Sequence, residues 1–262
     1  MVTRILTAIV ALLLLIPLLI WGGVWCAGAL FALIAGFSVY EMLGCCGLFK
    51  KWAVSITSII VAAFISISPV WDTNIAAKVI ILGLPALTVL FLIFAVITHA
   101  NTDVERLLMF ITLFTYITAG FTALSFMRVS YGLWAVALVL SVAWATDTFA
   151  YFSGMLFGNK KLCPNISPKK TIAGAIGGTA FGTAAGVLVF WLADRNPLLG
   201  LIARPLSIVS QFGDLAASVI KRRFGVKDYG KIFPGHGGVL DRFDSIIPVA
   251  IISLALLFVL GL

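Results

Sequence analysis

The sequence predicts an all-α membrane protein, a polytopic transmembrane helical bundle of about nine spans. Its 262 residues are 62% hydrophobic and only 11% charged, and their mean hydropathy is +1.16. Soluble chains are about half apolar and a quarter charged. Apolar runs of about 20 residues recur along the chain, long enough to cross the hydrocarbon core of a bilayer. The runs are continuous rather than alternating, which argues against a transmembrane barrel.

The predicted spans follow one another with short links. They cover residues 5–21, 24–40, 52–68, 75–97, 104–126, 133–152, 171–193, 198–219 and 245–262. The first is favoured as a membrane helix over a signal peptide, because only Arg4 precedes it and no small-residue cleavage site follows. No link is long enough to form a soluble domain.

The distribution of basic residues predicts the orientation. An odd number of spans places the two termini on opposite sides of the bilayer. Every basic residue then falls on the side of the N-terminus except Lys78, Arg128, Arg195 and Arg204. Since Lys and Arg are enriched in cytoplasmic loops, that side is predicted to be cytoplasmic. The predicted location is the cell inner membrane or plasma membrane, with the active site facing the cytoplasm.

The chain is predicted to have two functional halves. Residues 1–127 are expected to form N-terminal membrane scaffold helices, and residues 128–262 a catalytic membrane region with cytoplasmic substrate-binding loops. In the second half, glycine recurs every fourth residue, at Gly174, Gly178, Gly182 and Gly186. This glycine face allows close approach by another helix, either another span or a second subunit. The four cysteines lack zinc-ligand spacing and are expected to be small buried or interfacial side chains.

Charge and glycine concentrate in residues 211–245, QFGDLAASVIKRRFGVKDYGKIFPGHGGVLDRFDS. Three carboxylates, Asp214, Asp241 and Asp244, flank a run of basic residues and a glycine-rich turn. Oxygen ligands of this kind suit Mg²⁺, which proteins commonly hold with a few carboxylates and substrate phosphates. Asp241 and Asp244 also suit the start of a helix, so these two acids do not by themselves establish a metal site. The glycines are consistent with a phosphate-binding loop or with a simple turn.

Two further segments carry polar groups beside apolar ones. Asp147 lies within the predicted span 133–152, where a carboxylate faces a polar cavity or forms a structural hydrogen bond with another span. Before the span 171–193, Pro168 and Thr171 suit a helix start. Lys169 and Lys170 either anchor that helix in the cytoplasm or hold phosphates at its N-terminus.

Taken together, hard-metal carboxylates, clustered cations and glycine turns at one membrane face predict phosphoryl or nucleotidyl transfer. The net charge of +8 agrees with a phosphorylated substrate or an anionic membrane surface. The alternative is a membrane transporter for a phosphorylated or anionic solute, which would not need a glycine-rich, cation-dense loop.

The motifs SVIKR at 218–222, KD at 227–228, FPGHGG at 233–238 and DRFD at 241–244 resemble the signature of the phosphatidate cytidylyltransferases, the CDP-diacylglycerol synthases. Residues 147–158, Lys161 and the SPKKT of 167–171 resemble the second motif of that family. Here Ile172 and Ala173 stand where the family usually has Trp-Glu, so a role for that glutamate is in doubt in this chain. The DG-x-x-AR pattern of CDP-alcohol phosphotransferases is absent.

The resemblance implies condensation of CTP with phosphatidic acid to CDP-diacylglycerol and pyrophosphate in phospholipid biosynthesis. It also implies Mg²⁺, a monovalent ion such as K⁺ as a second ion, a homodimer among membrane lipids, and no nucleic acid. Asp214, Asp241 and Asp244 would be the metal ligands, with Lys221 beside them in the catalytic group. The residues expected to bind substrate are Asp147, Ser167, Lys169, Lys170, Thr171, Ser218, Arg222, Lys227, His236, Gly237, Gly238 and Arg242.

Overall fold

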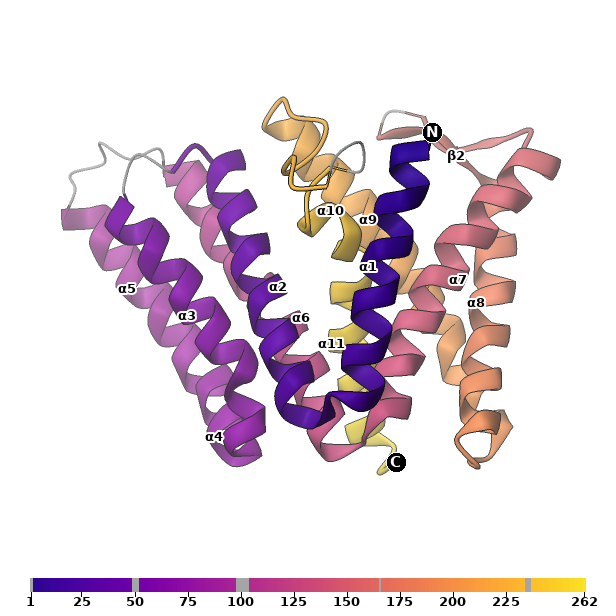
Figure 1. The fold of residues 1–262 in the computed structure, drawn as a ribbon. Helices are drawn as coiled ribbons and strands as arrows, with labels where there is room; N and C mark the ends of the chain where they lie inside the picture. The colour runs from indigo at the N-terminus through magenta and orange to yellow at the C-terminus, as the bar shows by residue number, and fades with distance from the viewer. Residues whose placement is uncertain (1, 49–51, 98–103, 165, 234–236) are drawn as a thin grey trace. The chain divides into compact units, whose positions relative to one another are not determined.

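The computed structural model describes residues 2–48, 52–97, 104–164, 166–233 and 237–262 (Figure 1). The chain folds as two compact units. The first unit comprises Met1–Ser130 and Asp228–Asp241, and the second comprises Tyr131–Lys227 and Arg242–Leu262. A segment from the basic, glycine-rich region of the sequence therefore packs with the N-terminal helices rather than with the C-terminal ones.

The first unit is a helical bundle. Its elements are α1 (Val2–Trp21), α2 (Gly23–Cys45), α3 (Trp52–Trp71), α4 (Thr73–Lys78), the π-helical turn η1 (Val79–Gly83), α5 (Leu84–Ile97) and α6 (Val104–Ser130). Helices α2, α3 and α6 pack against one another around fully buried side chains such as Phe31, Met42 and Phe121. Between α1 and α2 the chain turns at Gly23, whose φ of +68° is a conformation that favours glycine.

The second unit contains the remaining helices and a short hairpin. Its elements are α7 (Leu133–Phe157), β1 (Lys161–Cys163), β2 (Ser167–Thr171), α8 (Ile172–Leu192), the 3₁₀ turn η2 (Pro197–Ile202), α9 (Ala203–Arg223) and α11 (Ile246–Val259). The short helix α10 (Leu240–Phe243) contains residues of both units. Helices α7 and α8 form the most extensive contact, and α9 packs against α7, α8 and α11. Figure 1 shows the hairpin beside the end of α7 and the start of α8.

The all-α prediction is confirmed, and each predicted segment contains a helix. Within the described residues, six helices are long and apolar enough to cross a membrane: Gly23–Cys45, Val54–Trp71, Thr73–Leu90, Glu105–Ser130, Leu133–Phe157 and Ile172–Leu192. Helix α9 is not among them, because polar and charged side chains line one of its faces. Helix α11 is apolar but has only 14 residues.

The β-hairpin was not predicted. Its antiparallel strands place Lys161 opposite Thr171 and Cys163 opposite Ser167. Pro168, which has no N–H to donate, is exposed within this two-stranded sheet, where both strands are edges. Pairing satisfies backbone groups in the short link between two apolar helices, which sequence periodicity over so few residues does not reveal.

The glycine face of α8 is a packing face, as predicted, and its partners belong to the same chain. All four glycines are buried. A Cβ at Gly178 would lie 2.8 Å from the Thr146 carbonyl of α7, and one at Gly182 would lie 2.7 Å from the Ser207 hydroxyl of α9. At Gly186 the Cβ would overlap Ala203. The absence of side chains thus lets α7, α8 and α9 approach to backbone distance.

The cysteines differ in burial, and only Cys46 is a buried side chain as the sequence predicts. Cys46, which follows α2, is fully buried, while Cys26 is exposed and Cys45 and Cys163 are intermediate. The pKa of the Cys46 thiol is raised to about 12, mainly by burial and also by the neighbouring Cys45, while Arg106 opposes the shift. The Cys46 thiol is therefore protonated at neutral pH and packs as a small hydrophobic group.

Substituting Gly182→Val tests the packing of α7, α8 and α9. The added carbons would overlap Thr146 and Ser207, and overpacking of this kind costs about 1–3 kcal/mol of stability. We expect a lower unfolding midpoint in detergent by thermal denaturation. Ala184→Val on the exposed face of α8 is the matched control and is expected to change stability by less than about 0.5 kcal/mol. Equal effects of the two substitutions would contradict the assigned face.

Candidate active site

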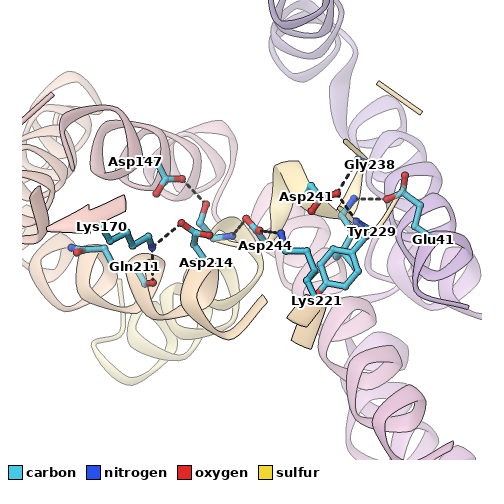
Figure 2. A network of polar contacts seen from close by, with 12 residues as sticks. Glu41, Asp147, Lys170, Gln211, Asp214, Lys221, Tyr229, Gly238, Asp241 and Asp244 are labelled. Carbon is cyan, nitrogen blue, oxygen red and sulfur yellow. Dashed lines mark hydrogen bonds and ion pairs between the residues drawn. The ribbon is translucent and has the colours of Figure 1, made fainter. Parts of the chain in front are cut away.

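A salt bridge between the hairpin and α9 forms the centre of the second unit's polar site. The Lys170 Nζ, on β2, lies 2.7 Å from Asp214 Oδ2, and the two side chains are 25% and 34% exposed (Figure 2). The same ammonium donates to the Gln211 carbonyl oxygen at 3.4 Å. Gln211 precedes Asp214 by three residues on α9, so both groups face one side of that helix. The pair is accessible enough to meet a ligand and buried enough to be oriented.

Helix α8 fixes this arrangement from the other side. The Gln211 side-chain amide donates to the Ala175 carbonyl at 3.2 Å and to the Thr179 hydroxyl at 3.0 Å. Thr171, the residue after Lys170, caps α8 by accepting the Gly174 N–H at 3.1 Å. The predicted helix start at this threonine is therefore confirmed, and the cap directs the strand that carries Lys170.

Two glycines at the end of α7 leave room for the capping threonine. A Cβ at Gly154 would lie 2.9 Å from the Thr171 hydroxyl oxygen, and one at Gly158 would lie 2.7 Å from the same atom. These glycines belong to the motif at 147–158, and the structure gives them a packing role.

A second set of contacts joins three helical segments near the start of α11. The Ser245 hydroxyl donates to Asp147 Oδ2 at 2.9 Å, and the Ser245 N–H donates to Asp244 Oδ1 at 2.9 Å. The Lys221 Nζ, at the end of α9, lies 3.6 Å from Asp244 Oδ2, and both of these side chains are 12% exposed. Asp147 is thus connected through Ser245 and Asp244 to Lys221, as Figure 2 shows.

These contacts belong to one polar site. Asp147 is close enough to Asp214, Lys170 and Arg242 to interact with them electrostatically. Gly213 brings the backbones together beside Asp214, because a Cβ there would lie 2.8 Å from the Asp244 carbonyl oxygen. The site extends into the bundle, since Asp147 is ten residues from the end of α7, or about 15 Å along the helix. Asp147 is nevertheless exposed, although the helix that carries it is apolar.

The first unit holds a different carboxylate arrangement. Asp241 Oδ2 accepts the Tyr229 N–H at 2.8 Å and the Gly238 N–H at 2.9 Å, and Asp241 is 9% exposed. Gly237 has a φ of +86°, which favours glycine, and a Cβ there would lie 2.9 Å from Asp241 Oδ2. The carboxylate therefore closes the glycine turn through charge-assisted hydrogen bonds.

Glu41, on α2, was missed by the sequence reasoning. Its carboxylate accepts the Val239 N–H and the Leu240 N–H, each at 2.9 Å. It is only 3% exposed. The available signal was a single acid inside an otherwise apolar predicted helical region, the same signal that singled out Asp147. A helix of the N-terminal half thus contacts the backbone of residues 239–240.

The structure describes all but one of the other predicted site residues. Ser218 is half-buried on α9, four residues after Asp214, and Ser167 is half-buried on β2. Four predicted substrate-binding cations are exposed: Lys169, Arg222, Lys227 and Arg242. His236 lies outside the described residues.

The carboxylates of the second unit suit a hard cation. Among the residues that the structure describes, no three Asp, Glu, His or Cys side chains are grouped so that they alone could hold a metal ion. One or two carboxylates completed by substrate phosphates and water are, however, the usual way in which proteins bind Mg²⁺. Asp214 and Asp244 provide such oxygens, and each already faces a cationic group.

Comparison with known proteins identifies the family. The Cytidylyltransferase family matches residues 2–260. The chain belongs to this family. It is 37% identical over 255 residues to a phosphatidate cytidylyltransferase of Staphylococcus haemolyticus, which covers 94% of each chain. It is also 46% identical over 152 residues to a phosphatidate cytidylyltransferase of Brucella abortus, and that match covers 55% of this chain and 54%, about half, of the relative.

In this member of the cytidylyltransferase family, the departure from the usual Trp-Glu lies next to the capping threonine. Ile172 is 42% exposed at the start of α8, and Ala173 is half-buried. Neither side chain supplies a carboxylate. The acid that pairs with Lys170 is instead Asp214, with Asp147 at longer range.

The Ser245→Ala substitution tests the contact that reaches Asp147. Removing a hydrogen bond to a charged group costs about 1.5–3 kcal/mol, so we expect reduced stability in chemical or thermal unfolding. Ser253→Ala, on the same helix, is the matched control. Its hydroxyl is buried without a hydrogen-bond partner among the described residues, so its loss is expected to be neutral or stabilising. Equal loss from both variants would argue against the Ser245–Asp147 contact.

Proposed function

We propose that this protein is a phosphatidate cytidylyltransferase that condenses CTP with phosphatidic acid to form CDP-diacylglycerol and pyrophosphate. The observation that carries the proposal is the Lys170–Asp214 pair beside Asp147, an exposed carboxylate on an apolar helix. Membership in the cytidylyltransferase family and the names of the relatives support it.

The geometry suits a substrate whose head is charged and whose tails are apolar. The tails of phosphatidic acid remain in the bilayer, while its phosphate meets the polar groups around Lys170 and Asp147. One phosphate oxygen attacks the α-phosphorus of CTP in line. The new P–O bond forms as the bond to the β-phosphate oxygen breaks, and that electron pair leaves with pyrophosphate. An ionised phosphate needs no general base, which agrees with a site built from cations and carboxylates.

The protein contributes position and charge. Lys170 and Lys221 are held by Asp214 and Asp244, so their ammonium groups are oriented before the substrates arrive. Such preorganised cations stabilise the negative charge that develops on the phosphates without reorganisation during the reaction. The exposed cations Lys169, Arg222, Lys227 and Arg242 draw the nucleotide to this face. We propose that the remaining phosphate contacts come from His236, Gly237, Gly238 and the residues next to them.

Mg²⁺ is the proposed cofactor, with a monovalent ion such as K⁺ as a second ion. Asp214 and Asp244 would hold it with substrate phosphates, and Asp241, in the first unit, stays the third predicted ligand. When bound, Mg²⁺ would neutralise phosphate charge and favour departure of pyrophosphate.

A transporter for an anionic solute is the other candidate class. It would not consume CTP and would not generate a lipid nucleotide. Formation of radiolabelled lipid from labelled CTP, dependent on both phosphatidic acid and Mg²⁺, separates the two functions.

Substituting Asp214→Asn removes the charge that orients Lys170 and a proposed metal ligand. We expect CDP-diacylglycerol formation to fall by at least about 100-fold, while gel filtration shows a folded protein. Asp194→Asn is the matched control. Asp194 is exposed after α8 with a φ of 53°, which asparagine also adopts, so its activity should match the wild type. Full activity of the Asp214 variant would exclude the proposed role.

The proposed topology has nine membrane-crossing helices, with the end of α7, the start of α8 and the basic end of α9 in the cytoplasm and two copies forming a homodimer. Green fluorescent protein folds only in the cytoplasm, so we expect a fusion before residue 1 to fluoresce and one after Leu262 to remain dark. Alkaline phosphatase fusions should give the reverse pattern. Fluorescence from both ends would show an even number of spans, and chemical cross-linking in membranes tests the dimer.

A further inference from the structure

Glu41 contacts the backbone of residues 239–240, in its own unit, with both carboxylate oxygens. Oε1 accepts the Val239 N–H and Oε2 accepts the Leu240 N–H, each at 2.9 Å. The side chain is 3% exposed, on a helix otherwise suited to cross the membrane. A buried carboxylate is costly unless hydrogen-bonded, and here each oxygen accepts from a separate amide.

Two glycines provide the space for this carboxylate. A Cβ built at Gly230 or at Gly238 would overlap the Glu41 carboxylate group. Neither glycine has a positive φ, so backbone conformation does not require glycine at these positions. Their lack of a side chain is instead explained by the contact with Glu41. Gly238 belongs to the FPGHGG motif, so part of that motif faces α2.

The same backbone orients Asp241. Three consecutive amides are held by two carboxylates: Gly238 donates to Asp241, while Val239 and Leu240 donate to Glu41. The Asp241 carboxylate also accepts the Tyr229 N–H, on the other side of the turn. Figure 2 shows Glu41 and Asp241 on either side of this short stretch of backbone. A shift of the backbone at 238–240 would therefore move the donor that aims Asp241.

We propose that Glu41 is a positioning residue for the reaction: it anchors the backbone at 238–240 and, through Gly238, sets the orientation of the Asp241 carboxylate. This inference rests on the proposed function, because Asp241 acts there on the metal and phosphates. Partners that orient a ligand without touching substrate typically change activity by about 10- to 100-fold when they are altered.

The Glu41→Gln variant keeps the size of the side chain but loses its charge and one acceptor. One of the two amides then faces an NH₂ group instead of an oxygen. We expect kcat to fall by about 10- to 100-fold, with the KM for phosphatidic acid within about twofold of the wild type. Hydrogen–deuterium exchange should accelerate at Tyr229 and 238–240, while exchange in α3 stays unchanged.

Asp72→Asn is the matched control for this variant. Asp72 is also a carboxylate of the first unit that accepts two backbone N–H groups, those of Asn74 and Ile75, but at the start of α4. The Asp72→Asn substitution should leave kcat and the hydrogen exchange of residues 238–240 unchanged. Unchanged exchange and kcat in the Glu41→Gln variant would overturn the proposal. Faster exchange throughout the first unit would also overturn it, since that result indicates a general structural role.

Gly238→Ala disturbs the same contact from the opposite side and provides the test if Glu41→Gln does not fold. Its methyl group would displace the Glu41 carboxylate without straining the backbone, so we expect the same local increase in exchange and loss of kcat. Gly83→Ala, whose Cβ would make an ordinary 3.5 Å contact with Val79, is the control. The double variant Glu41→Gln, Gly238→Ala should be no worse than the more severe single one, and additive losses would count against a shared contact.

The two proposals fail in different ways. If the wild-type protein forms no lipid product from CTP, the proposed function fails, while hydrogen exchange still tests the anchor. If the wild type is active and both variants match it in kcat and exchange, only the role of Glu41 is lost.

Discussion

An ionised side chain inside a helical bundle needs a counter-charge or a set of hydrogen-bond donors, and this requirement organises each unit of the molecule. Isolated charge in a low dielectric is costly, so acids that are partly or fully buried pair with groups elsewhere in the sequence. Asp214 forms a salt bridge with Lys170 on the hairpin, and Glu41 accepts hydrogen bonds from amides almost two hundred residues away in the sequence. Each such contact joins segments that the hydrophobic effect alone would not bring into a defined register.

Close helix packing makes the pairing in the second unit possible. The glycines of α8 allow the backbones of α7 and α9 to approach it directly, and the Thr146 and Ser207 hydroxyls meet at 2.6 Å inside this contact. With larger residues on that face, Gln211 would not reach Ala175 and Thr179. The small-residue face therefore does more than stabilise the bundle, since it also sets the distance between the cation on β2 and the acid on α9.

The resulting site is suited to chemistry on phosphates at a membrane. Its ammonium groups are already oriented by carboxylates, so little reorganisation is needed when negative charge develops. The polar groups extend from the exposed cations at the ends of the helices to Asp147 within a span. The glycine-rich segment is held by carboxylates rather than by bulky side chains, which keeps its backbone close to its neighbours.

Composition and spacing in the sequence determined the helical class, the approximate helices, the glycine packing face and the helix cap at Thr171, and they singled out the acids and cations that we propose carry the chemistry. These features depend on local periodicity or on the cost of burying a charge, and both can be recognised from a single sequence. Tertiary structure decided which cation meets which acid, that residues 228–241 fold with the N-terminal helices, and that Glu41 anchors the glycine segment. Such pairings depend on contacts between residues far apart in sequence, and a chain with several lysines and several acids allows many combinations. Only the packing of the helices selects one of them.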